Sequence, residues 1–385
     1  MPKKHGSTSL SPRRVGVVLL ISVAALSGIS CKPAPPAAPA ISLSIVMQTV
    51  REYGRGQQSA QPIPSKVLAA SSTHPSHELY DADGAYQAHI AIIFMQGDFA
   101  QLEQEAEKAR TSKAQLTGAV SKLSGLYEGV ASPPGEDHST EADWDAHLAS
   151  LKKWTAAYPE STTARVALAN AYVAYAWAAR GVGYSDSVTR SGWKLYGQRI
   201  ALAKSTLVEA ARLKQKCPIW YAVMQSVALS EGWEKSQARE LFQQAVEFDP
   251  SFLQYYRAYA YFILPKWYGE PGEAEQFAEE VSQKVTGPEA DIIYFEIASE
   301  IACQYDLYQS PVPKMSWEKI KAGYAAIDQL YGQSNLKANR FAFMAYLLGD
   351  KPAAQEAFTF IGDNRDLSVW NKGQFAFVKA WASAP

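Results

Sequence analysis

Two segments of this 385-residue chain gather side chains of the kinds that bind ligands, on backbone that contains glycine. The first carries Arg180, Tyr184 and Asp186, and the second carries Lys266, Trp267 and Tyr268. A cation beside aromatic rings can hold a carboxylate, a peptide or the face of a sugar. These six residues are therefore the candidate binding residues. The alternative is structural, with Trp267 filling space between helices and Arg180 capping helix carbonyls.

Recognised signatures of catalysis are missing from the sequence. It contains no Gly-x-Ser-x-Gly elbow and no glycine-rich phosphate loop, and the Gly-x-Gly at residues 181–183 is too short for a dinucleotide fingerprint. We therefore assign no catalytic residue. An envelope hydrolase or transferase with a site near Arg180, Tyr184, Asp186 and Lys266 remains the alternative to a binding function.

The histidines and the charge balance limit the possible ligands. All six histidines precede residue 150, and His74 and His77 have no cysteine or carboxylate placed to complete a metal site. We expect no metal and no cofactor. The chain has 37 basic and 38 acidic residues, with no basic block beyond the N-terminal segment, so we expect no nucleic-acid partner.

The N-terminal segment has the layout of a signal peptide over residues 1–30. Lys3, Lys4, Arg13 and Arg14 precede an apolar run at residues 15–29, and small residues lead to Cys31. The run is shorter than the roughly 18 residues that a membrane-spanning helix needs. A signal peptide is therefore favoured over a transmembrane anchor.

Residues 28–31, Gly-Ile-Ser-Cys, resemble the lipobox of bacterial lipoproteins, with Gly28 where that family prefers leucine. The resemblance implies that Cys31 is acylated and that the protein is anchored in the cell envelope, with its domain facing the periplasm. A conventional cleaved signal with a soluble product is the alternative. Residues 31–80 are rich in proline and alanine, and we interpret them as a linker holding a short helix near residues 41–53.

Beyond the linker, residues 81–385 show helical periodicity, and no hairpin signal is present. The clearest unit is residues 238–250, in which Ala238, Phe242, Ala245 and Pro250 have the spacing of the second helix of a tetratricopeptide repeat; its partner is residues 218–231. Similar pairs recur along the chain. The sequence predicts an all-α fold, either a tetratricopeptide-like α-solenoid or a compact stack of antiparallel helix pairs.

Several runs also resemble an uncharacterised bacterial family of helical domains of unknown function. They are residues 94–99, 176–184, 217–221 and 264–269. This resemblance implies a helical domain but no activity. We therefore expect a non-enzymatic, lipid-anchored envelope protein that binds a protein or peptide partner. Cys217 and Cys303 lie in separate helical pairs, and we expect two buried free thiols.

Overall fold

The computed structural model describes residues 41–55, 82–134, 139–181, 185–303, 314–371 and 373–384. Cys31 and Tyr184 lie outside these residues. The described chain is all-α, as the periodicity predicts. The helices of its first half are α1 (Leu43–Tyr53), α2 (Ala82–Gln96), α3 (Phe99–Ser112), α4 (Lys122–Gly129), α5 (Glu141–Ala157), α6 (Thr162–Arg180), α7 (Arg190–Ala210), α8 (Pro218–Glu231) and α9 (Lys235–Phe248).

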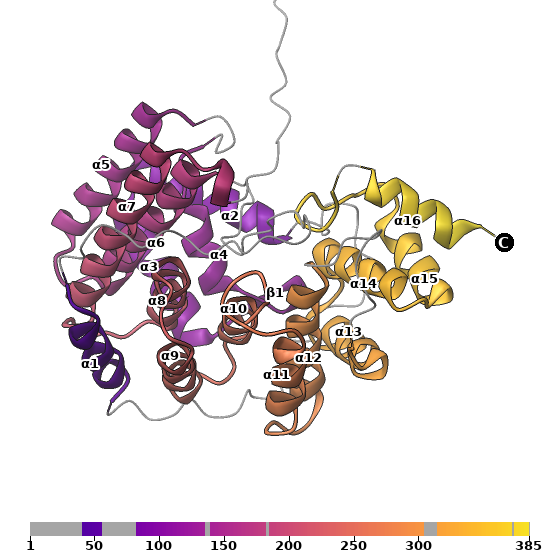
Figure 1. Cartoon of the computed structure of the whole chain (residues 1–385). Coiled ribbons are helices and arrows are strands. Elements are labelled where there is room, and N and C mark those ends of the chain that lie inside the picture. The colour runs from indigo at the N-terminus through magenta and orange to yellow at the C-terminus, as the bar shows by residue number, and fades with distance from the viewer. Residues whose placement is uncertain are drawn as a thin grey trace, which may run out of the picture.

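The second half continues the series of helices. They are α10 (Gln254–Phe262), α11 (Glu273–Ser282), α12 (Pro288–Ala302), α13 (Trp317–Tyr331), α14 (Asn335–Leu347), α15 (Lys351–Ile361) and α16 (Gln374–Ser383). Chain neighbours pack as pairs, notably α6 with α7, α8 with α9, α12 with α13 and α14 with α15. Figure 1 shows α1, α3 and α5 to α9 on one side of the molecule and α11 to α16 on the other, with α2, α4 and α10 between them.

The pair α8–α9 shows how the small and large residues of the repeat unit work. Ala238 and Ala245 are buried, so the neighbouring helix can approach, and Phe242 fills the space between them. Its ring stacks on Tyr259 of α10 with centroids 5.0 Å apart. Burying a side chain of this size stabilises the fold by about 1.5–3 kcal/mol. The pair therefore propagates the stack to the next helix.

Helix α1 lies within the segment that we interpret as a linker, yet it belongs to the folded body. It packs against α9. Its last residue, Tyr53, is buried and stacks on Trp220 of α8 with centroids 4.0 Å apart. The Tyr53 hydroxyl also accepts a hydrogen bond from the Cys217 backbone at 2.9 Å. The helical body consequently begins near residue 43.

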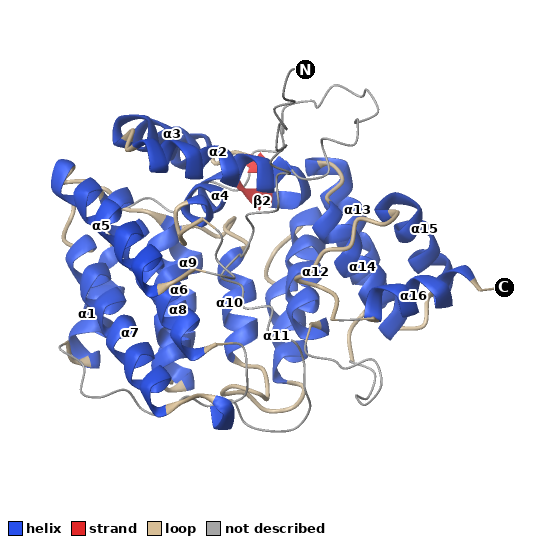
Figure 2. Cartoon of the chain, turned by 90° about the horizontal axis from the view of Figure 1, so that it is seen from above, coloured by secondary structure: helices blue, strands red, loops and turns tan. Residues whose placement is uncertain are grey.

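A small β-ribbon is present in a segment where the sequence shows no hairpin signal. Strands β1 (Gln115–Leu116) and β2 (Val120–Ser121) pair antiparallel around the 3-10 turn Thr117–Ala119, labelled η2. Gly118 has a φ of 72° and donates its backbone N–H to Gly332 at 3.1 Å. A Cβ at Gly118 would lie 2.4 Å from that of Ser334, so only glycine allows this approach. The ribbon thus joins α4 to the α13–α14 region (Figure 2).

Helices α12 and α13 approach closely at Gly323, in the middle of α13. A Cβ there would lie 2.1 Å from the backbone oxygen of Asp291 and 2.7 Å from the Cβ of Phe295. The missing side chain therefore sets the distance between the two helices.

Two further observations concern membrane-spanning helices and the cysteine thiols. No helix in the described part of the chain is long and apolar enough to cross a membrane. Cys217 and Cys303 are both free, the first buried and the second partly exposed.

Candidate functional site

The C-terminal end of α6, which carries Arg180, lies beside the loop that carries Lys266 and Trp267. Trp177 of α6 packs edge-to-face on Trp267, with ring centroids 6.0 Å apart. The Arg180 guanidinium lies 5.1 Å from the Trp177 ring, and the Lys266 ammonium lies 5.9 Å from the Trp267 ring. We call these four residues the aromatic–cation cluster.

Burial limits what this cluster offers to a ligand. Arg180 is 5% exposed and Trp267 is 3% exposed. Arg180 donates from Nη1 to the Gly181 carbonyl at 3.0 Å, which is the capping contact of the structural alternative. Tyr268 donates its hydroxyl to the Leu229 carbonyl at 2.9 Å. Asp186 is exposed and Lys266 is partly exposed, so a ligand could reach the cluster only at its edge.

A second group of polar residues, which the sequence reasoning missed, lies at the centre of the molecule. Arg257 of α10, Glu296 and Glu300 of α12, and Lys337 and Arg340 of α14 are all buried. We call these five residues the charge cluster.

Glu296 is the hub of the charge cluster. Its Oε1 pairs with the Lys337 ammonium, while its Oε2 lies 3.5 Å from Arg257 Nε and 3.8 Å from Arg340 Nη1. Glu300, one helical turn further, accepts from Arg257 Nε at 2.8 Å and also from its Nη2. Three cations therefore share two carboxylates.

The charges of the cluster shift one another's protonation. Burial opposes ionisation of Glu296, but the attraction of Lys337, Arg257 and Arg340 outweighs it and lowers the Glu296 pKa. Burial also lowers the pKa of Lys337 to about 8, against the opposing attraction of Glu296. The Glu296 carboxylate is thus charged at neutral pH, and the Lys337 ammonium is close to its titration range.

A cleft with a volume of about 60 Å³ opens beside the charge cluster and is partly open to solvent. We call it the central cleft. Its lining combines four residues of the charge cluster with polar and apolar side chains from α2, α4, the β-ribbon and the segment before α10. These residues are Asp83, Gln115, Ala119, Val120, Ser121, Ser124, Glu128, Ser251, Phe252, Leu253, Gln254, Arg257, Glu296, Leu336, Lys337 and Arg340.

Glu128 lies on the α4 side of the central cleft. Burial and the neighbouring Asp83 raise its pKa to about 8, although Arg257 and Lys337 act in the opposite direction. Gln87 donates from Nε2 to its Oε2 at 2.6 Å. At neutral pH most Glu128 side chains are therefore protonated and uncharged.

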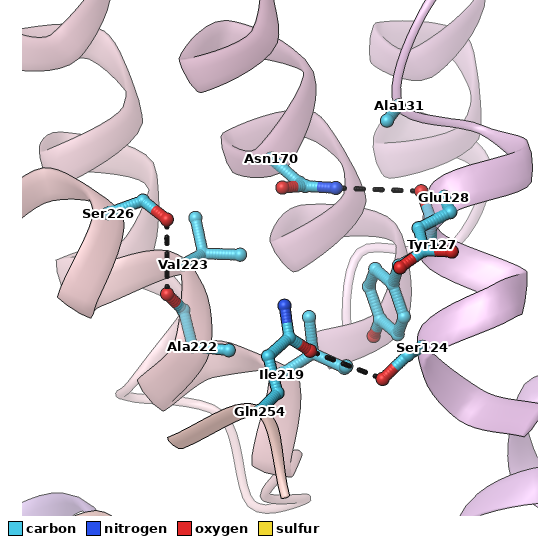
Figure 3. A pocket seen from close by; sticks show the side chains of 10 residues that line it. All are labelled: Ser124, Tyr127, Glu128, Ala131, Asn170, Ile219, Ala222, Val223, Ser226 and Gln254. Atoms are coloured by element: carbon cyan, nitrogen blue, oxygen red, sulfur yellow. Dashed lines mark hydrogen bonds between the residues drawn. The ribbon is translucent and has the colours of Figure 1, made fainter. Parts of the chain in front are cut away.

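A smaller pocket adjoins the central cleft and shares Ser124, Glu128 and Gln254 with it. Figure 3 shows the Ser124 hydroxyl donating to Gln254 Oε1, a bond of 3.2 Å. Asn170 of α6 closes the other end and donates to the Tyr127 carbonyl at 3.5 Å. The pocket carries the polar lining of the central cleft inward, between α4 and α8.

The sequence contains a signal for the charge cluster. Glu296 and Glu300 are spaced i, i+4 within the otherwise apolar run of α12, and Lys337 and Arg340 are spaced i, i+3 within α14. Charges on apolar helix faces are rarely buried unless they are paired. The four charges therefore indicated a buried polar site, but not which helices would meet there.

Comparison of the chain with models of protein families, with curated proteins and with solved structures finds no match. The geometry by itself therefore defines the class: an all-α protein of stacked helix pairs, with a charged cleft where its two halves meet.

Proposed function

We propose that this protein is a non-enzymatic binding or scaffold protein that presents a helical-repeat groove to a protein or peptide partner. One observation carries the proposal, the central cleft between the two halves of the helical stack. Val120, Phe252 and Leu336 lie there among polar and charged side chains, which make up most of the lining. A cleft that combines apolar surface with oriented polar groups suits a ligand that has both kinds of surface.

A photo-crosslinking residue in place of Gln115 tests this proposal in intact cells. Gln115 lines the central cleft and is exposed, so a partner seated there lies within reach. We expect a specific crosslinked product from this position. The matched control is the same replacement at Glu356, an exposed position of α15 that does not line the cleft. A product pattern that is identical at both positions, or no product at Gln115, contradicts the proposal.

We further propose that the protein is anchored in the cell envelope through acylated Cys31. The support is the lipobox-like sequence together with a helical body that begins only twelve residues later, at Leu43. Cells fed radiolabelled palmitate should label the protein, and Cys31→Ser should abolish the label and release the protein from membranes. Unlabelled protein in the soluble fraction of wild-type cells would contradict the anchor.

The hydrolase or transferase remains a second candidate function, because Trp177, near the end of α6 that carries Arg180, packs on Trp267 beside Lys266. Asp186 and Lys266 are the members of this site that reach solvent. Turnover of cell-envelope glycans or peptides by the purified protein, lost in Asp186→Asn, would support this function. Equal turnover by the variant would remove Asp186 from it.

A further inference from the structure

Among the described residues, the charge cluster holds three cations and two carboxylates. Arg257, Lys337 and Arg340 face Glu296 and Glu300, and Glu128 on the α4 side is mostly uncharged at neutral pH. Asp83, the remaining acidic group of the lining, lies near Glu128 and raises its pKa. A buried charge without a counter-ion is costly to a folded protein. Because Asp83 supplies a third acidic charge to the lining, the place for a ligand anion is indicated by the Arg340 guanidinium, which lacks hydrogen bonds to described residues, and not by a net charge.

Arg340 is the cation whose hydrogen bonds are missing. Its side chain is 6% exposed, yet Nε and Nη1 have no hydrogen-bond partner among the described residues. The nearest carboxylate oxygen, Glu296 Oε2, is 3.8 Å from Nη1, which is too long for a hydrogen bond. That oxygen is itself without a hydrogen-bond partner in the described structure. Glu296 thus holds Lys337 and leaves the Arg340 guanidinium available.

The geometry and the charge favour one particular ligand group. A guanidinium offers parallel N–H donors that match the two oxygens of a carboxylate. Glu296 and Asp83 line the same cleft, and their charges repel a singly charged carboxylate less than a doubly charged phosphate. Beside Arg340, the lining contains Leu336, Val120 and Phe252, which suit an apolar body attached to that carboxylate.

We propose that Arg340, assisted by Lys337 and Arg257, forms an oxyanion subsite in the central cleft that binds the carboxylate of an apolar ligand or ligand segment. This inference deepens the proposed binding function and rests on it only for the location of the site. Arg340 donates to the carboxylate, and the neighbouring cations supply the field that holds the negative charge there.

Titration of the purified full chain with sodium hexanoate, followed by calorimetry and by the melting temperature, tests the subsite. Hexanamide has the same apolar body without the charge, and sodium phosphate supplies the other oxyanion, all at ionic strength fixed with sodium chloride. We expect saturable binding and stabilisation by hexanoate, neither of which hexanamide produces. Binding of phosphate alone, or of neither anion, overturns the assignment of a carboxylate site.

The variant Arg340→Met removes the proposed donor. We expect its affinity for hexanoate to fall roughly tenfold to a hundredfold, which is the usual effect of one or two charge-assisted hydrogen bonds. Arg199→Met is the matched control, because the Arg199 side chain is equally buried at 7% exposed but is paired with Glu141 outside the cleft. Unchanged affinity in Arg340→Met overturns the proposal.

The melting temperature without ligand separates a ligand-binding arginine from a structural one. Arg340→Met breaks no hydrogen bond between described residues and loses only the 3.8 Å ion pair with Glu296, so its melting temperature should fall less than that of Arg199→Met. Arg199→Met should melt lower, because it loses the hydrogen bonds that Arg199 donates to the Tyr175 carbonyl and to Glu141. Equal destabilisation by both variants overturns the proposal. If Arg340→Met does not fold, Arg340→Lys keeps the charge and must still weaken hexanoate binding.

The crosslinking experiment at Gln115 and the hexanoate titration can give opposite results, and each result tests a different proposal. Loss of hexanoate binding with a crosslink still formed at Gln115 refutes the carboxylate subsite and leaves the partner-binding function standing. Hexanoate binding that depends on Arg340, without any crosslinked partner in cells, refutes the macromolecular partner and leaves the subsite standing.

Discussion

Replacing Glu296 with glutamine removes one negative charge from the point where three buried cations converge. The Glu296 side chain is 1% exposed, and its carboxylate faces Lys337, Arg257 and Arg340 at once. Glutamine has nearly the same shape, so the packing around it is retained. After the change a single carboxylate, that of Glu300, remains for three cations.

The loss in free energy of unfolding depends on how many buried charges are left without a partner. Removing one partner of a buried ion pair typically costs about 3–5 kcal/mol. The three contacts do not add, because Lys337 already has its pKa lowered to about 8 and can release its proton. We therefore expect Glu296→Gln to lower the free energy of unfolding by about 3–5 kcal/mol, a large part of the roughly 5–15 kcal/mol of an ordinary protein.

Urea unfolding followed by circular dichroism at pH 7, in buffer without carboxylates or phosphate, measures this loss. The control is Glu318→Gln, in which the same change is made at a side chain 82% exposed and paired with Lys321. Surface pairs of this kind contribute about 0–1 kcal/mol. If the two variants unfold at the same urea concentration, the charge cluster does not depend on Glu296 and the reasoning from convergence fails.

Three further outcomes follow from single contacts. Because the Glu128 pKa is raised to about 8, the folded state binds its proton more tightly than the unfolded state, so stability should fall as the pH rises from about 4.5 to about 8; urea unfolding across that range should show a weaker fall in Glu128→Gln. Gly323→Ala should lower the melting temperature by the equivalent of about 1–3 kcal/mol, since overpacking against Asp291 outweighs the helix propensity of alanine; a rise in melting temperature would contradict the close approach of α12 and α13. Asp350→Ala should cost about 1–2 kcal/mol in urea unfolding, because the Asp350 side chain caps α15 and accepts the Trp317 indole N–H at 2.7 Å.

The helix pairs could be predicted from the sequence wherever small and large apolar residues keep a regular period. The α8–α9 pair is the clearest case, because Ala238, Phe242 and Ala245 define one face and Gly232 ends the preceding helix. At Gly232 the φ of 67° and a Tyr268 hydroxyl 2.9 Å from the position of a Cβ explain why the turn requires glycine. Local chemistry was sufficient for these elements.

The sequence pattern did not predict helix α7 as a member of a pair, because its buried and exposed positions are partly the reverse of an amphipathic helix. Arg199 and Lys204 are buried, where the periodic pattern leads one to expect apolar residues, while Leu195 and Leu202 are exposed. The buried cations are paired with Glu141 and Glu231, which lie in other helices. The ion-pair partners in other helices determine which side chains of α7 are buried, and the periodicity of a single segment does not reveal those partners.

The candidate sites, too, could be predicted from the sequence only where they depend on local residues and not on tertiary packing. The meeting of Arg180 with the Trp267 loop could be proposed from residue types, but the burial of both side chains could not, since it depends on how α6 and α7 pack. The charge cluster draws on three helices separated by about forty residues each, and no sequence window contains all of its members. Convergence of this kind is a property of the fold.

The β-ribbon between β1 and β2 changes how the stack should unfold. In an open solenoid each repeat contacts only its neighbours, so the ends fray independently. Here the backbone hydrogen bond from Gly118 to Gly332 links segments more than two hundred residues apart, and helix α1 packs against α9. These contacts tie α1 and the start of the α13–α14 region to the middle of the chain, so the helices gain cooperativity. Long-range closure of this kind also slows folding, because distant segments must meet before the final contacts form.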